Sequence, residues 1–191
     1  MGILVAAFLA SGADESARRG AFEKEFQSKE AAQRVEALKK LAGAKESKTL
    51  ELLARGLKDA AKEVRLAAAE TLEGCTDGGG VAVKALCAGV TDPKEDPAVR
   101  LACAKALAKS PYQHDPIDAM IKAICSISNK DRDLFKFGSD VTGVLEARTG
   151  ETSFGRGKET PMLWQGWWKE NEPRLKKEDE QHRKEFEKAG K

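Results

Sequence analysis

Three segments of the chain repeat one pattern of apolar and polar positions. They span residues 33–41, 64–72 and 99–107. In each segment an arginine is followed seven residues later by a leucine, and apolar residues recur between them at helical spacing. The arginines, Arg34, Arg65 and Arg100, lie 31 and then 35 residues apart. A helix with one apolar face that recurs at such intervals is typical of a repeat protein.

A second amphipathic helix is predicted next to each of these segments. Apolar residues recur at i, i+3 and i+7 in residues 49–57 and 81–90, and at similar spacing in residues 117–127. Flanking helices are predicted over residues 16–27 and 134–148. The chain is also rich in alanine, leucine, glutamate and lysine, which favour helix. The sequence therefore predicts an all-α domain of about four helix pairs.

The turn before two of the arginines contains an aspartate. Asp59 lies six residues before Arg65, and Asp92 lies eight residues before Arg100. Each of these arginines directly follows a valine. In HEAT repeats an aspartate in the turn precedes, by six residues, an arginine of the second helix. The chain therefore resembles the HEAT repeat family, including its short bacterial type, with two extra residues in the turn after Asp92.

This resemblance implies a right-handed α-α superhelix, a HEAT-like solenoid of the armadillo type, over residues 14–148. In the family, the aspartate and the arginine join one repeat to the next by hydrogen bonds. The resemblance therefore implies a structural and not a catalytic role for five residues, namely Asp59, Arg65, Asp92, Arg100 and, in the first repeat, Arg34. The last repeat lacks the valine–arginine signature, as expected of a terminal repeat that caps an open core.

The densest aromatic cluster of the chain lies in residues 149–172. Gly150 predicts the end of the last repeat helix, and a short helix follows in which Trp164, Trp167 and Trp168 share one face. Some bacterial HEAT-like proteins end with Thr-Gly, Phe-Gly and Trp-x-x-Trp-Trp, and this segment resembles that ending. We interpret the segment as a cap over the apolar end of the stack. The alternative is an aromatic platform for a sugar or a cationic ligand.

The two ends of the chain differ from the repeats. Residues 173–191 are highly charged and predict a solvated helix or a disordered tail. Residues 1–13 are uncharged and apolar, too few to span a membrane. They resemble the hydrophobic region and cleavage site of a secretory signal peptide, without the usual positively charged start. This reading predicts a bacterial protein that is exported to the periplasm or beyond, with a mature chain that starts near Asp14 and has no membrane span. The alternative is an apolar first helix packed on the solenoid, in a cytoplasmic protein.

The residues with reactive side chains form no recognisable site. The four cysteines, Cys75, Cys87, Cys103 and Cys125, contain no C-x-x-C pair, and no histidine lies near them at zinc-ligand spacing. We expect them to be small buried apolar residues, although export would allow a Cys75–Cys87 disulfide. The two histidines lie next to no nucleophile in the sequence. We therefore expect no enzyme, no cofactor and no metal.

Charge limits the choice of partner. The chain has 33 Lys and Arg against 31 Asp and Glu, a formal net charge of +2. A nucleic-acid binder calls for a clustered basic excess. Lysines on the repeated helices are interleaved with glutamates: Lys39, Lys40, Lys105 and Lys109 with Glu36, Glu63, Glu70 and Glu73. The sequence therefore favours a scaffold or adaptor that binds an unidentified protein on its concave face. The alternatives are a nucleic-acid backbone binder that uses the inner helices, and a lyase-like chaperone.

Overall fold

The computed structural model describes residues 12–73, 75, 80–127 and 132–189, and within them the chain forms nine helices and no strand. This confirms the predicted all-α class for the described part. Eight of the helices follow one another as four pairs: α1 (Gly12–Glu25) with α2 (Ala31–Lys39), α3 (Ser47–Gly56) with α4 (Lys62–Glu73), α5 (Val81–Thr91) with α6 (Pro97–Ala108), and α7 (His114–Cys125) with α8 (Arg132–Thr149). The longest helix, α9 (Thr160–Ala189), comes last.

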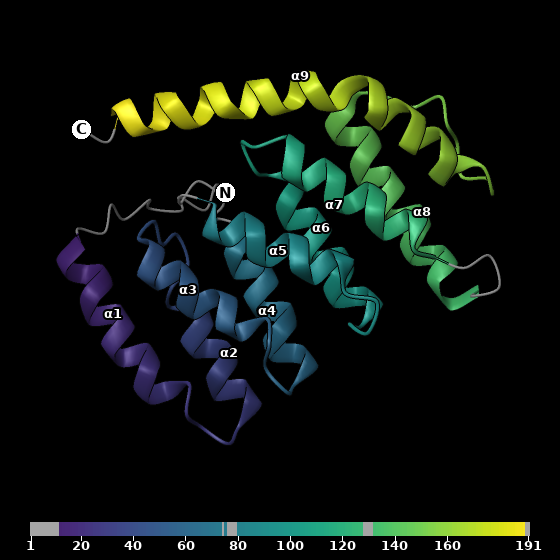
Figure 1. Cartoon of the computed structure of the whole chain (residues 1–191). Coiled ribbons are helices and arrows are strands. Elements are labelled where there is room, and N and C mark those ends of the chain that lie inside the picture. The colour runs from purple at the N-terminus through teal and green to yellow at the C-terminus, as the bar shows by residue number, and fades with distance from the viewer. Residues whose placement is uncertain (1–11, 74, 76–79, 128–131, 190–191) are drawn as a thin grey trace, which may run out of the picture.

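The paired helices form two layers (Figure 1). In the even layer, α2, α4, α6 and α8 contact one another in that order. In the odd layer, α1, α3, α5 and α7 do the same, and α9 packs on α7. The two helices of each pair also contact one another, so each pair adds one helix to each layer. Such an arrangement fits an α-solenoid in general.

Carboxylates define where several helices begin. Asp96 precedes α6 and accepts a hydrogen bond from the backbone N–H of Ala98 at 2.8 Å, while Pro97 occupies the first helical position. The carboxylate at the start of α3 belongs to a residue about 30 positions earlier in the sequence. Glu15 of α1 accepts hydrogen bonds from the backbone N–H groups of Lys45 at 2.9 Å and Glu46 at 3.3 Å. These bonds satisfy N–H groups that a helix start leaves without partners.

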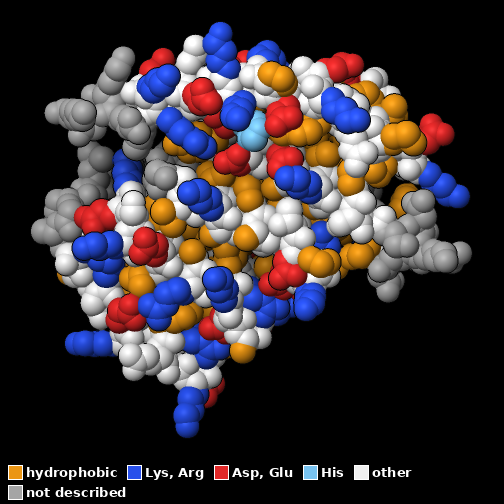
Figure 2. All heavy atoms as spheres, in the orientation of Figure 1, with side chains coloured by type: hydrophobic (Ala, Val, Ile, Leu, Met, Phe, Trp, Pro, Cys, Tyr) orange, Lys and Arg blue, Asp and Glu red, His pale blue; other side chains and the backbone are white. Residues whose placement is uncertain are grey.

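Charged side chains are spread over the face of the stack that Figure 2 shows. Figure 2 shows lysines and arginines intermixed with aspartates and glutamates over the face in view, with hydrophobic side chains between them. No broad region of one charge lies on this face. Such a mixture of charges attracts a polyanion only weakly.

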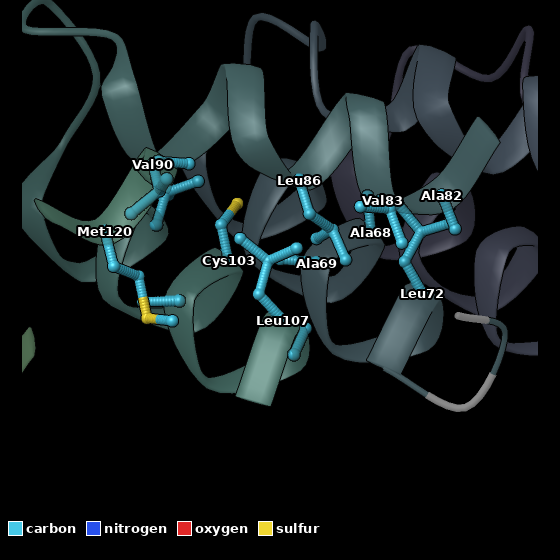
Figure 3. Packing of buried hydrophobic residues seen from close by; sticks show 14 of the residues in the cluster. Ala68, Ala69, Leu72, Ala82, Val83, Leu86, Val90, Cys103, Leu107 and Met120 are labelled. Carbon is cyan, nitrogen blue, oxygen red and sulfur yellow. The ribbon is translucent and has the colours of Figure 1, made fainter. Parts of the chain in front are cut away.

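Small side chains allow the helices of the core to lie close together. Figure 3 shows Ala68, Ala69 and Leu72 of α4 against Leu86 of α5, with further apolar side chains from α6 and α7. The labelled alanines and leucines are fully buried. Because alanine has no side chain beyond Cβ, it brings neighbouring helix backbones together without leaving a void.

The helix α9 spans parts of two segments that the sequence pattern assigned to different elements, residues 149–172 and 173–191. It begins before Trp164 and runs through Pro173 to Ala189, so no helix end falls at the predicted boundary at residue 172. Figure 1 shows α9 bending as it passes from the α8 end of the stack to its upper edge. A proline inside a helix removes one backbone hydrogen bond and bends the helix. The aromatic cap and the charged segment therefore belong to one element.

A glycine controls the approach of α3 to its neighbours and provides a test of this packing. A Cβ atom added to Gly56 would lie 2.8 Å from Leu38 Cδ2 and 2.9 Å from Ala68 Cβ. Although alanine favours helix more than glycine does, we expect Gly56→Ala to lower the free energy of unfolding by about 1–3 kcal/mol because it overpacks this contact. Chemical denaturation measures the change.

The control for this prediction is Gly20 of α1, which is exposed and has open space around its added Cβ. Gly20→Ala is expected to raise the free energy of unfolding by about 0.5–1 kcal/mol, since only helix propensity changes. Equal effects at the two positions would contradict the close packing of α2, α3 and α4.

Candidate functional site

Arginines at the starts of the even-layer helices join one helix pair to the next. Arg34 of α2 binds Asp59, in the turn before α4, through two hydrogen bonds of 2.8 Å. Its remaining nitrogen donates to the backbone oxygens of Ser28 at 2.8 Å and Lys29 at 3.1 Å. The same guanidinium therefore holds the turn of its own pair and the turn of the next. Such a bidentate pair fixes orientation as well as distance.

Arg65 of α4 forms the same bridge one pair further along the stack. Its guanidinium lies 2.8 and 2.9 Å from the two carboxylate oxygens of Glu95. It also donates to the backbone oxygens of Asp59 at 2.8 Å and Ala60 at 3.0 Å. The partner of Arg65 in the next turn is therefore Glu95, and the motif residue Asp92 does not bind Arg65. The Asp92 side chain is exposed and accepts from the backbone N–H of Lys94 at 2.8 Å, because the longer turn brings Glu95 to the position opposite Arg65.

Arg100 of α6 makes a different contact at the third junction. It is 1% exposed and donates to the backbone oxygen of Val90 at 3.0 Å. Its guanidinium carbon lies 4.3 Å from the ring centre of Phe137 in α8. A cation–π contact thus takes the place of the carboxylate pair. Burial lowers the pKa of Arg100 from its ordinary value.

The even-layer helices share one direction. The bridges place the start of α2 beside the start of α4, and the start of α4 beside the start of α6. At the other end, Arg148 near the end of α8 donates to Ala108 O at 2.6 Å and Ser110 O at 2.9 Å, at the end of α6. Equivalent residues of these helices therefore lie side by side.

This alignment produces two rows of side chains on the even layer. The residue after each arginine is half-buried and apolar, and these residues, Val35, Leu66 and Leu101, form the apolar row. The residue four positions later is exposed and charged, and these residues, Lys39, Glu70 and Lys105, form the charged row. Residues four apart lie on the same face of a helix. The rows therefore run next to each other across α2, α4 and α6.

The charges of this surface are free to meet a partner. Within the described part of the chain, Glu70 and Lys105 form no ion pair. Lys39 contacts Glu36 at 2.8 Å, but both side chains are more than half exposed, and such pairs stabilise a fold by only about 0–1 kcal/mol. We call the apolar row and the charged row together the even-layer surface.

The three predicted cap tryptophans lie on α9, and their burial differs. Trp164 is fully buried, with the Phe154 ring 5.1 Å away and the Trp167 ring 5.6 Å away, both edge to face. Trp167 and Trp168 are half-buried. Trp168 lies 5.2 Å from the ring of His114 at the start of α7. The cluster therefore packs α9 against the last helix pair.

Asp179 is a structurally important residue of α9 that was not predicted from the sequence. It lies in the segment predicted as a charged tail, yet it is 4% exposed. Its carboxylate accepts hydrogen bonds from the backbone N–H groups of Gln113 at 2.7 Å and His114 at 2.9 Å. Two turns of α9 bring Leu175, Asp179 and His182 to one face, and this spacing was the only signal in the sequence.

Three described residues with reactive side chains lie together near the start of α7, namely His114, Asp115 and Cys87. His114 Nδ1 lies 2.8 Å from Asp115 Oδ1, and the nearby Cys87 thiol lies 3.5 Å from the backbone oxygen of Asp115. Burial, together with the negative charge of Asp115, raises the pKa of Cys87 to about 12. A thiol in this state is a poor nucleophile. All four cysteines are free thiols, and burial also raises the pKa of Cys103 to about 12.

Neither a metal-binding cluster nor a membrane-spanning helix occurs among the described residues. These residues include no group of three or more histidines, cysteines, aspartates or glutamates that could hold a metal ion. None of the described helices combines the length and the apolar composition that crossing a membrane requires. The predicted signal peptide falls largely outside the described residues, and α1 begins at Gly12, next to the predicted cleavage position.

Comparison with known proteins provides no family for the chain. No protein-family model matches it, and neither does any curated protein.

The Arg34–Asp59 bridge predicts a particular response to acid. The hydrogen bond from Arg34 lowers the pKa of Asp59 from its ordinary value. A carboxylate with a lowered pKa stabilises the fold at neutral pH, and this contribution disappears as the pH falls through the lowered pKa. We expect Asp59→Asn to reduce the free energy of unfolding at neutral pH. The difference from the unmodified protein should vanish in acid, below the ordinary range of an aspartate.

Urea unfolding over a pH series measures this difference. Glu36→Gln, which removes an exposed charge from α2, is the control and should change stability by less than about 1 kcal/mol. A difference for Asp59→Asn that stays constant down to acid pH would contradict the bridge.

Trp164 tests the role of the cap. Trp164→Ala should lower the free energy of unfolding by about 3–5 kcal/mol, because it removes a fully buried side chain. Met162, which is 67% exposed, lies two residues away on the same helix, and Met162→Ala should leave thermal stability nearly unchanged. Unchanged stability of Trp164→Ala would instead favour the aromatic ligand platform.

Proposed function

We propose that the chain is a non-catalytic scaffold or adaptor that binds another protein through the even-layer surface. In this proposal the helix pairs form a right-handed HEAT-like superhelix with the even layer on its concave side. Solenoids of stacked helix pairs present extended concave surfaces of this kind.

The main support for this proposal is that the apolar row and the charged row lie next to each other. Half-buried Val35, Leu66 and Leu101 provide apolar contact, and exposed charges lie beside them on aligned helices. Protein interfaces combine apolar contact with a polar rim in this way. The bidentate arginine bridges hold the helices that carry the rows, which reduces the cost of ordering the surface on binding.

The charges of the surface favour a protein over a nucleic acid. The exposed lysines Lys39 and Lys105 flank a helix whose exposed side chains include Glu63 and Glu70. A phosphate backbone that crossed α4 would meet these carboxylates, and a binder of nucleic acid depends on neutralising phosphates. A protein can instead place opposite charges at each position.

Affinity capture from the native host tests the proposal. The tagged chain is compared with a Leu66→Glu, Leu101→Glu variant, and retained proteins are quantified by mass spectrometry. We expect the variant to lose most of the specific partners, because it places charge in the apolar row. Thermal melts establish that the variant is folded. Glu70→Lys, at a fully exposed site, is a second variant that leaves the core intact.

The control carries the same kind of change on the odd layer. Lys84 and Ala88 are exposed on α5, and Lys84→Glu, Ala88→Glu should retain the partners. Equal retention by all variants, or loss only in the odd-layer control, would reject the even-layer surface as the binding site.

A further inference from the structure

The charged row alternates in sign along the stack. Lys39 on α2 is basic, Glu70 on α4 is acidic and Lys105 on α6 is basic. Glu63 and Glu73 add to the acidic character of α4 on either side of Glu70. A partner that crosses the three helices therefore meets a basic, an acidic and a basic position in turn.

The distance between these positions indicates which secondary structure the binding segment of the partner has. Packed helices lie about 8–10 Å apart, so successive positions of each row are separated by about this distance. An α-helix advances about 10.5 Å in seven residues. A helix laid across α2, α4 and α6 would therefore return the same face to each helix of the surface.

An extended peptide could match the spacing but not the chemistry of this surface. Its backbone N–H and C=O groups would need partners. The helices α2, α4 and α6 carry one side-chain amide, Gln33 of α2, so no row of amides crosses them to supply these partners. Their own backbone groups are satisfied within the helices. A bound helix brings its own backbone hydrogen bonds and needs only side-chain contacts.

We propose that the even-layer surface binds an amphipathic α-helix of the partner that crosses α2, α4 and α6. Its apolar residues recur at intervals of about seven and contact Val35, Leu66 and Leu101. Beside them, an acidic, a basic and an acidic side chain lie opposite Lys39, Glu70 and Lys105. This inference rests on the proposed protein-binding function and specifies the chemistry of the partner.

Two synthetic helical peptides of about 21 residues test the inference. Both carry leucines every seventh residue. One has acidic, basic and acidic residues beside the leucines, and the other has the opposite charges. We expect the full chain to bind the first peptide about tenfold more tightly in fluorescence anisotropy, and added salt to reduce the preference.

Charge reversal on the protein supplies the decisive comparison. A triple variant should bind the second peptide more tightly than the first. It combines Lys39→Glu, Glu70→Lys and Lys105→Glu. The control carries the same net change on the odd layer: Lys48→Glu, Glu51→Lys, Lys84→Glu, all at exposed positions of α3 and α5. It should keep the original preference. A shift that appeared equally in both variants would reflect net charge alone and overturn the inference.

Other outcomes separate this inference from the proposed function. If neither peptide binds, or if both bind with equal affinity, the inference that the partner presents a helix is overturned. The capture experiment would still decide whether the even-layer surface binds protein. A dimer of the chain that is lost in Glu70→Lys and restored by mixing with Lys105→Glu would assign the surface to a second copy, which would also overturn the inference.

Discussion

The arginine bridge between successive helix pairs is the interaction on which the stack depends. One helix pair has an apolar face on each side and cannot bury both alone, so the next pair must dock in a defined orientation. Arg34 and Arg65 supply that orientation, because each binds the turn of its own pair and a carboxylate in the following turn. Apolar packing supplies most of the stabilisation, but it is not directional. The bridges therefore determine register, while the alanine-rich core determines distance.

The first and the last of the described helices are held by other contacts. At the C-terminal end the carboxylate is replaced by the Phe137 ring over Arg100, and α9 packs its aromatic cluster against α7. Asp179 then connects α9 to the start of α7. At the N-terminal end, Arg18 of α1 donates to the backbone oxygens of Lys40 and Ala42. Charged groups thus hold both terminal helices through backbone atoms of the neighbouring turn.

The sequence predicted the helices well because their periodicity is local information. The structure has a helix at each of the eight repeat positions, and the arginines lie at the junctions. The partner of Arg65 was not predictable from spacing. The turn before α6 has two additional residues and presents Glu95 to Arg65, while Asp92 binds the backbone N–H of Lys94. Asp179 was missed for a related reason. A carboxylate within a charged run looks solvated until the bend of α9 places it against a helix start. The two rows of the candidate surface likewise exist only once neighbouring helices are aligned.

We propose that the even layer, and not the odd layer, contacts a partner protein. Site-specific photo-crosslinking in the native host tests it most directly. A photoreactive amino acid replaces Ala98, which is exposed on α6, or Ala88, which is exposed on α5. We expect a discrete crosslinked protein from position 98 and none from position 88. A crosslink from position 88 alone, or a crosslink from position 98 to nucleic acid, would contradict it.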